Sequence, residues 1–380
     1  MSSHPFPTPT ETLSIREARS LVKDLFQPSP KIFWTDFLVT MAIGGTAFGL
    51  ISRTPRWSIW QLLAFVVCAA AYYRATIFTH ELVHLPAGKW KAFRATWNLL
   101  CGIPFLMPSF TYYTHIDHHR RKHYGTRRDG EYIPLGSMPP YKIALYLSQA
   151  FVAGPLAVIR FGLITPLSWF SPRIRDLAAK HASSMVMDPT YIRPLPPRRV
   201  RLVWRLQEAL CFAWIVGVVV VIFRGIIPIT GTPLPTDFIP KCYLLSVAII
   251  LVNSVRTLAS HRFYGANEEE MSFTEQLVDS VNHPDKAWLG GLWAPLGQRF
   301  HALHHLFPTI PYHNLAEAHA RLMAGLAERS PYRLTISPGL LATLRQLWAN
   351  SRAASQVTPT LPMPRENFES QEPGEQRLAV

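Results

Sequence analysis

Four stretches of the chain are apolar over a length that suits a membrane-crossing helix. A helix needs about 20 apolar residues to cross the hydrocarbon core of a bilayer. The second stretch begins with two tryptophans, the residue type enriched at the boundary between lipid and water. The pattern therefore predicts a mainly α-helical integral membrane protein with about four transmembrane helices. The stretches cover residues 33–51, 57–78, 202–223 and 242–258.

Two further apolar segments are interrupted by proline. Residues 97–110 are too short to cross, so we expect a re-entrant or interfacial segment there. Residues 141–171 contain Pro155, Gly162 and Pro166. They predict amphipathic or interfacial helices, and a full crossing is the alternative.

The two ends of the chain differ in composition from the apolar region. Residues 1–32 predict an amphipathic helix from about residue 10 to residue 26 on the membrane surface, and they lack the apolar core of a secretory signal peptide. Residues 351–380 are rich in Pro, Glu and Gln, which predicts a disordered tail. A membrane domain over residues 33–350 lies between them.

The chain has a formal net charge of +14, although only 16% of its residues are charged. Lysine and arginine are dense before the first apolar stretch, between the second and third, and after the fourth. By the positive-inside rule, we expect both termini and all histidine clusters to face the cytoplasm. The basic residues follow no nucleic-acid-binding pattern, so the expected partner is the lipid bilayer and not nucleic acid. The four cysteines are widely spaced, which predicts free thiols.

Histidines are concentrated near the ends of the apolar stretches. One cluster has the spacing HxxxH and two have HxxHH, so each places its imidazoles on one helical face. Neutral imidazole is a common ligand of iron, zinc and copper. Eight clustered histidines exceed the ligands of one metal, which predicts two metals held between helix ends. With one more histidine after the fourth apolar stretch, the candidates are His80, His84, His115, His118, His119, His261, His301, His304 and His305.

The first cluster also satisfies HExxH, the zinc hydrolase motif in which the glutamate is the general base. Glu81 would take that role, and its position in a membrane helix suggests an intramembrane protease. One zinc ion would use two or three ligands and leave both HxxHH clusters without a function. The zinc protease is therefore the remote alternative, and a non-catalytic metal-binding membrane protein is a third hypothesis.

In combination the clusters resemble the HxxxH, HxxHH and HxxHH boxes of the membrane fatty acid desaturase superfamily, which also contains alkane hydroxylases. The resemblance covers residues 30–335 and includes the segments THELVHLPAG, YTHIDHHRRKHYGTRRDGE, RTLASHRFYG and HALHHLFPTIPYHNL. It implies a non-haem centre of two iron ions, Fe2+ or Fe3+, a cytoplasmic helical cap that carries the boxes, and an acyl-chain tunnel. It also carries the ligand role to the eight box histidines and to His261, with no catalytic side chain beyond the metal ligands.

Some acyl-CoA desaturases have an asparagine four residues before the extra histidine, where it holds a metal-bound water. This chain has Thr257 at that position, and Asn253 lies four residues earlier. Asn282 is a further candidate, so the sequence leaves the water-holding role unassigned. Other candidates for contact with ligand imidazoles are Glu81, Asp117 and His123.

The activity that the resemblance implies is dioxygen-dependent oxidation of a fatty acyl chain, in the first place the introduction of a C=C bond. The same scaffold supports two alternatives, which are oxidative decarboxylation of a free fatty acid to a terminal alkene and hydroxylation of an alkyl chain. An alkyl C–H bond is far too weak an acid for side-chain chemistry, which is why such a reaction needs the metal.

The electrons for this reaction are expected from outside the chain. The sequence contains no GxGxxG after a predicted strand, no ferredoxin-type cysteines and no cytochrome b5 motif. We therefore expect a ferredoxin, a rubredoxin or a cytochrome as donor, together with its reductase. A basic stretch after the second box is a candidate docking surface for an acidic carrier or an anionic head group, with ordinary membrane-surface charge as the alternative. Its residues are Arg120, Arg121, Lys122, Arg127 and Arg128.

Histidines outside the boxes have other expected roles. His181 and His283 are expected at the surface, whereas His313 and His319 are expected to be structural or to support the ligands. Arg256, beside the fourth apolar stretch, is expected either to bind a carboxylate head group or to anchor its helix in lipid.

Overall fold

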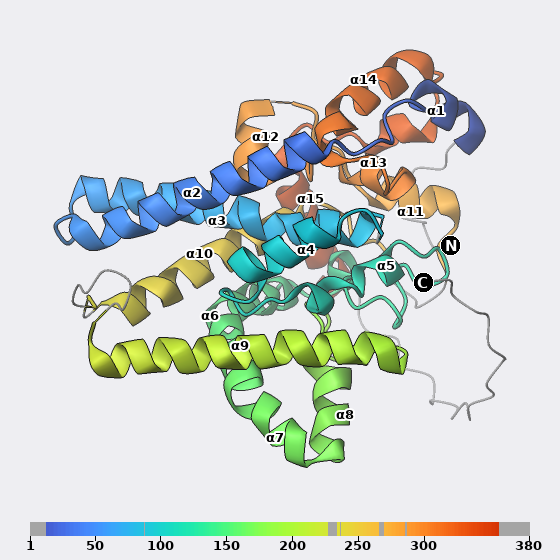
Figure 1. The fold of residues 1–380 in the computed structure, drawn as a ribbon. Coiled ribbons are helices and arrows are strands. Elements are labelled where there is room, and N and C mark those ends of the chain that lie inside the picture. Colours follow the sequence, from blue (N-terminus) through green and yellow to red (C-terminus); the bar gives the residue numbers. More distant parts are fainter. Residues whose placement is uncertain are drawn as a thin grey trace.

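The computed structural model describes residues 13–86, 88–226, 234–235, 237–265, 270–285 and 287–356, and these fold into helices joined by turns (Figure 1). Among these residues, pairing between extended segments is limited to isolated bridges, such as that between His261 and Ser280. The predicted mainly α-helical membrane fold is therefore confirmed.

The four predicted apolar stretches form four long helices. They are α2 (Pro30–Arg53), α3 (Ile59–His84), α9 (Arg198–Arg224) and α10 (Phe238–Leu258). They make two hairpins, α2 with α3 and α9 with α10. In each hairpin, the end of the first helix and the start of the second lie on the same side of the molecule, at the left of Figure 1. Large apolar side chains stay exposed on these helices, and this exposure suits contact with lipid chains.

Helix α3 continues through the first histidine cluster, whereas the hydropathy pattern predicts an end at residue 78. Ser58 caps the helix, because its side chain accepts a hydrogen bond from the backbone N–H of Gln61. The last turn contains His80 and Glu81, which are buried against other parts of the protein. A polar turn that is buried in protein needs no apolar surface for lipid, so hydropathy alone shortens the helix.

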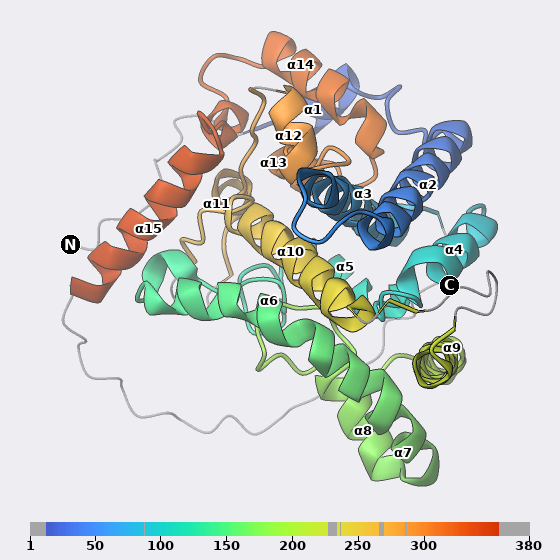
Figure 2. The same ribbon diagram turned by 90° about the vertical axis from the view of Figure 1, so that its left-hand side faces the viewer.

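A fifth segment, Tyr141–Phe170, is also long and apolar enough to cross a membrane. However, His84 ends α3 and His261 follows α10, and both belong to the histidine site described below. An even number of crossings must therefore separate them, and α9 and α10 supply two. Figure 2 shows α9 end-on and α6 (Tyr141–Ile159) lying across the view. The start of the segment is thus inclined to α9, and its interfacial position stays a prediction.

Shorter helices surround the polar ends of the hairpins. Helix α1 (Ile15–Leu21) is capped by Ser14 and packs against α14 (Leu315–Gly325), so it is shorter than the predicted helix over residues 10–26. Residues 1–12 lie outside the described part of the chain. Helix α15 (Leu340–Gln356) continues past residue 350, the predicted end of the membrane domain. The rest of the predicted tail, residues 357–380, lies outside the described residues.

The remaining helical elements are short, and several of them carry the histidines. The α-helices are α4 (Lys91–Trp97), α5 (His115–His118), α7 (Thr165–Phe170), α8 (Pro172–His181), α11 (Phe273–Asp279), α12 (Ala287–Trp293) and α13 (His301–Leu306). Two π-helical turns cover Asn98–Gly102 and Arg160–Ile164, and 3-10 turns cover Ser109–Tyr112, Leu135–Ser137, Tyr312–Asn314 and Pro331–Thr335. Residues 97–110 form only such short turns, as their length and prolines predict.

One half-buried ion pair lies where the first hairpin meets the segment after the third box. The Asp36 carboxylate on α2 accepts hydrogen bonds from the Arg74 guanidinium on α3, with 2.8 Å between Arg74 Nε and Asp36 Oδ1. The Tyr312 hydroxyl donates to the same carboxylate at 2.8 Å. Nearby, Phe33 packs edge-on against Phe78 of α3, which adds apolar contact to these polar links. These contacts hold the end of α3 in one position relative to the chain after α13.

Candidate metal centre

The nine candidate histidines come together in two groups. Within each group the nitrogen atoms that face one another lie within 4.8 Å. The first group takes its histidines from α3, from α5 and the residue after it, and from α13. The second takes them from α5, from α13 and from His261, the third residue after α10. The groups are His80, His84, His115, His119 and His304, and His118, His261, His301 and His305.

Local structure explains why the boxes divide between the groups. The HxxHH spacing puts its first and last histidines four residues apart on one helical face, and its middle histidine beside them. His115 and His119 therefore face one group while His118 faces the other. In the third box, His301 and His305 face the second group and His304 faces the first. Each HxxHH box thus serves both groups.

The imidazoles of the second group are arranged as a cation would require. His118 Nδ1 lies 2.8 Å from the Asp129 carboxylate, so its N–H is directed there and Nε2 keeps its lone pair. His261 Nδ1 lies 2.8 Å from the Tyr124 hydroxyl, which leaves Nε2 of His261 as the second lone pair. These two Nε2 atoms are only 3.2 Å apart, and His301 Nε2 lies 2.9 Å from His261 Nε2. Lone pairs that converge in a buried space repel one another unless a cation lies between them.

Unpartnered nitrogens in the first group point to the same fit. Among the described residues, Nε2 of His80 and Nε2 of His84 are buried and have no hydrogen-bond partner. A buried polar atom without a partner costs about 1–3 kcal/mol, so such atoms call for a ligand. The residues present therefore fit two metal ions, one in each group. The ligand role of each individual histidine stays a prediction.

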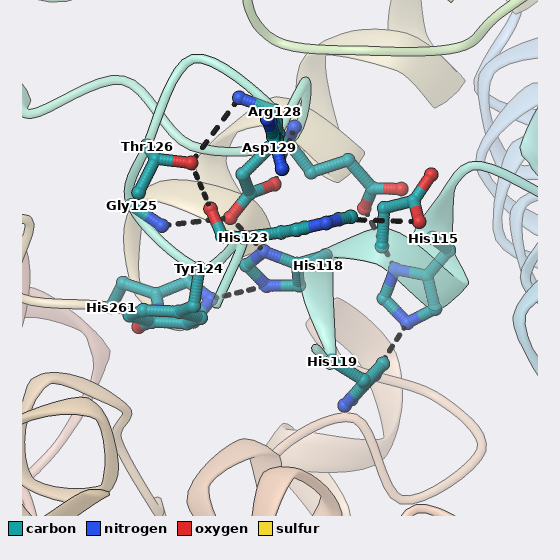
Figure 3. A network of polar contacts seen from close by, with 12 residues as sticks. His115, His118, His119, His123, Tyr124, Gly125, Thr126, Arg128, Asp129 and His261 are labelled. Atoms are coloured by element: carbon teal, nitrogen blue, oxygen red, sulfur yellow. Dashed lines mark hydrogen bonds and ion pairs between the residues drawn. The ribbon is translucent and has the colours of Figure 1, made fainter. Parts of the chain in front are cut away.

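Two carboxylates that were not predicted from the sequence support the second box, and Figure 3 shows one of them, Asp129, beside His118. Asp129 is 1% exposed and contacts His118, and Glu131 lies 2.9 Å from Nδ1 of His115. Carboxylates of this kind orient a ligand imidazole and increase its basicity. The only sequence signal for them is that Asp129 and Glu131 interrupt a basic stretch shortly after HxxHH.

The ninth histidine is held differently from the others. Tyr124 donates its hydroxyl hydrogen to Asp279 at 2.7 Å, so its oxygen accepts from the His261 Nδ1–H. Asp279 Oδ2 lies 3.6 Å from His261 Nδ1, so the phenol is the closer partner. Figure 3 shows Tyr124 beside His261 and His118. Neither Tyr124 nor Asp279 is predicted from the sequence, because Asp279 lies far along the chain from the second box.

The amide of Gln298 lies beside His80. Gln298 Nε2 lies 2.9 Å from His80 Nδ1, and Gln298 Oε1 accepts a hydrogen bond from Arg256 at 3.2 Å. Arg256 also donates to Asn253 Oδ1 at 2.8 Å. Asn253, a predicted support residue, is thus two side chains away from a histidine. Arg256 is buried in this network, so the structure does not support its expected role as a lipid anchor.

The other predicted support residues lie at different distances from the histidines. Glu81 Oε1 lies 3.4 Å from His80 Nδ1, and its second oxygen accepts from the backbone N–H of Tyr312 at 3.2 Å. Asp117 instead pairs with Arg120 at 2.9 Å and with His123 at 3.4 Å, in place of a clustered imidazole. The water-holding role stays a prediction for Thr257, Asn253 and Asn282.

Thr257 and Asn282 form hydrogen bonds with residues other than the clustered histidines. Thr257 donates its hydroxyl to the backbone carbonyl of Asn253 within α10. Asn282 is fully buried, accepts from the backbone N–H of Leu303 at 3.1 Å, and donates to Thr335 Oγ1 at 2.8 Å. It therefore positions α13, the helix that carries the third box.

Burial favours the neutral, metal-binding form of most of the imidazoles. It lowers the pKa of most of those outside the long helices, and neighbouring imidazoles lower it further. For His261, burial lowers the pKa while Asp279 opposes the shift. For His118, burial alone would lower the pKa, but the Asp129 carboxylate outweighs it and raises the pKa above its ordinary value. The histidines whose pKa is lowered by burial and by neighbouring imidazoles are His115, His119, His301, His304 and His305.

The remaining histidines lie outside both groups. The expectation that His283 is at the surface is wrong, because it is buried and its Nε2 contacts the carbonyl of Ala259 at 2.9 Å. Its position after the buried Asn282 explains the burial. His181 is exposed, as expected. His313 Nε2 accepts from the backbone N–H of Ser29, and His319 is buried against Tyr332, so both have structural contacts.

Comparison with known proteins confirms the resemblance that the boxes indicate. The profile of the family described as fatty acid desaturase matches residues 57–336. The chain is also 35% identical over 338 residues to a ceramide hydroxylase of Caulobacter vibrioides (strain NA1000 / CB15N), an alignment that covers 89% of this chain and 93% of that protein. Because one match spans most of the chain and the other nearly all of it, this protein is a membrane oxidoreductase of the fatty acid desaturase family.

Proposed function

We propose that this protein is a di-iron, dioxygen-dependent hydroxylase that acts on an aliphatic chain of a ceramide-like lipid. One observation carries the choice of reaction: the relative that matches nearly the whole chain is a ceramide hydroxylase. The two histidine groups support the metal chemistry, since they offer nine imidazoles in two clusters, six of them buried and three partly buried. Carboxylate-rich ligand sets are absent from the two groups, and nitrogen ligands suit iron better than magnesium or calcium.

The chain's own residues would hold and protect the metals. Five imidazoles would bind one ion and four the other, while Asp129 and Glu131 keep two of the rings in orientation. When bound, the two irons supply the redox chemistry that lets dioxygen oxidise an unactivated C–H bond. Most of the imidazoles and the Asp129 carboxylate are buried, so bulk water is kept from the reacting centre. The lipid must be oriented so that one carbon faces the site.

Desaturation is the second candidate, because the same family carries it out and the boxes are the same. Hydroxylation replaces one C–H bond by C–OH and keeps an oxygen atom from dioxygen in the lipid. Desaturation removes two hydrogens and leaves no oxygen in the lipid. The comparison with the ceramide hydroxylase favours the first outcome, and decarboxylation to a terminal alkene has no such support.

The proposal includes an external electron donor and a cytoplasmic site. Two observations support a docking surface for an acidic carrier beside the second box. All five basic residues of the stretch after this box are exposed, and they belong to the loop that also supplies Asp129 to the metal centre. Long-range attraction between opposite charges would speed the encounter with an acidic protein, and added salt would weaken it. These residues are Arg120, Arg121, Lys122, Arg127 and Arg128.

The test is expression in a host that makes ceramides but does not hydroxylate them. The cells are grown under 18O2, and their lipids are extracted and analysed by mass spectrometry. We expect a ceramide that gains one labelled oxygen atom. A product that lacks two hydrogens and contains no label would establish desaturation instead, and unchanged lipids would refute both. Metal analysis of the purified protein separates two irons per chain from the single zinc of a protease. His118→Ala should abolish the product, whereas His181→Ala, at an exposed histidine outside both groups, should not.

A further inference from the structure

Tyr124 occupies an unusual place at the edge of the second histidine group. Its side chain is 1% exposed, and its hydroxyl lies 2.7 Å from Asp279 Oδ2 and 2.8 Å from His261 Nδ1. The hydrogen of the phenol is directed to the carboxylate, and the oxygen accepts from the imidazole. One phenol therefore contacts both a ligand of the centre and a buried acceptor for its proton.

The ring of Tyr124 is in contact with further histidines of the same group. It stacks on His118 with 5.2 Å between ring centroids and 29° between planes, and it meets His305 edge-on at 5.5 Å. Tyr132, also buried, lies 5.2 Å from Tyr124 and 5.9 Å from His261 between ring centroids. Electron exchange between the phenol and the centre thus needs no step longer than one ring contact.

A second tyrosine shows what is special about this arrangement. Tyr112 stacks on His115 of the first group, with 4.9 Å between centroids and 19° between planes. Its hydroxyl, however, lies 3.3 Å from Glu131, an oxygen that also contacts the His115 N–H at 2.9 Å. The phenol of Tyr112 is thus a weak and secondary partner of its carboxylate, while that of Tyr124 is the first partner of Asp279.

We propose that Tyr124 is a redox-active residue: once dioxygen has oxidised the metal pair, Tyr124 donates one electron to that pair. In this step the phenol O–H bond breaks, the electron passes through the adjoining imidazoles, and the proton passes to Asp279 Oδ2. The products are a neutral tyrosyl radical, a protonated Asp279 and a metal pair reduced by one electron. Loss of the electron alone would leave a cation radical in a buried site, which is costly, and proton transfer to Asp279 avoids that charge.

This inference rests on the proposed function, because dioxygen and the metals supply the oxidant. Its consequence is that the oxidised metal pair can be reduced by an electron from tyrosine when no lipid is bound. Without such a route, the nearest oxidisable groups are the ligand imidazoles themselves.

The test is electron paramagnetic resonance on the purified full chain. The protein is loaded with ferrous iron without oxygen, exposed to dioxygen in the absence of lipid, and frozen at successive times. We expect an organic radical whose hyperfine pattern collapses when the protein is made with ring-deuterated tyrosine. Tyr124→Phe should lose the radical, and Tyr112→Phe, the matched change at the other stacked tyrosine, should keep it.

A second variant tests the proton route with the phenol in place. Asp279→Asn keeps an oxygen that can accept the phenol hydrogen bond but not a strongly basic site for the proton, so the radical should also be lost. Iron content is measured for each variant. If Tyr124→Phe does not bind iron, the inference is judged on whether Asp279→Asn forms the radical. Oxidation of the iron in the unmodified protein without any tyrosyl radical would overturn the inference, as would the same radical in Tyr124→Phe. Lipid hydroxylation is assayed separately, so a protein that forms the radical but no hydroxylated lipid would refute the proposed reaction alone.

Discussion

The support that Asp129 gives to His118 can be tested by a change that keeps the side-chain shape, Asp129→Asn. The carboxylate accepts three hydrogen bonds: from His118 Nδ1 at 2.8 Å, from the backbone N–H of Gly125 at 3.1 Å and from the backbone N–H of Glu131 at 3.0 Å. Asparagine replaces one oxygen by NH2, so at least one of these donors faces another donor. The better orientation turns the NH2 toward Glu131 and keeps the oxygen on His118.

The magnitude follows from these contacts. One buried donor left without a partner costs about 1–3 kcal/mol of folding free energy. Loss of a carboxylate behind a ligand imidazole lowers metal affinity by about 10–100-fold, which corresponds to about 1.4–2.8 kcal/mol of binding free energy. The loss should fall on the ion held by the group of His118, because Asp129 has no contact with the other group among the described residues.

Iron bound per chain is measured against increasing chelator concentration, for the unmodified protein and for the variant. We expect the unmodified protein to lose two irons at high chelator, and Asp129→Asn to lose the first iron at a concentration about 10–100-fold lower. Asp117→Asn is the matched control, since this carboxylate in the same box pairs with Arg120 and His123. If Asp129→Asn releases iron like the unmodified protein, or if Asp117→Asn weakens binding as much, the assignment of Asp129 is wrong.

Three further predictions follow from the same contacts. Asn282→Ala leaves the Leu303 N–H unpaired in a buried position and should reduce the free energy of unfolding by about 2–3 kcal/mol; an unchanged melting temperature in detergent would refute the role of Asn282 in holding α13. Burial lowers the pKa of His319 to about 4, so the unfolded chain takes up a proton at this residue before the folded chain does as the pH falls. Protonation of His319 in the unfolded chain should therefore lower the free energy of unfolding between about pH 6.5 and pH 4, by on the order of 3 kcal/mol in total. His319→Phe should therefore lose less stability over that pH range than the unmodified protein, and parallel melting curves for the two would contradict this. Removal of iron by a chelator should lower the melting temperature, because ligand binding at 1,000 times its dissociation constant stabilises by about 4 kcal/mol; a metal-free protein that melts at the same temperature would argue against the centre.

The long helices follow from the sequence because the requirement of a bilayer is local. Each crossing segment must satisfy its own backbone hydrogen bonds and present apolar side chains over about 20 residues. Hydropathy therefore placed α2, α3, α9 and α10, but it shortened α3 by its last turn. That turn is polar and buried by protein, a condition that no window along the chain reports.

The histidine boxes were also within reach of the sequence, and for the same reason. Spacings of three and four residues put side chains on one helical face wherever the helix lies, so HxxxH and HxxHH predict clustered imidazoles. The sharing of His115, His118 and His119 between two groups does not follow from spacing alone. It depends on how α5 faces both α3 and α13, which are distant in the chain.

Only the tertiary structure decided which groups support the histidines. Asp129 and Glu131 read as two acids in a basic loop, and Asp279 reads as a surface residue at the end of a short helix, yet each is turned toward an imidazole or toward Tyr124. Hydropathy and helical spacing are properties of neighbours along the chain, so the sequence by itself determined the helices and the metal-binding faces. The partners of those faces are set by tertiary packing, which folds the loop after the second box back onto His115 and His118 and brings Asp279 to Tyr124 from 155 residues away along the chain. Neither hydropathy nor helical spacing reports such contacts.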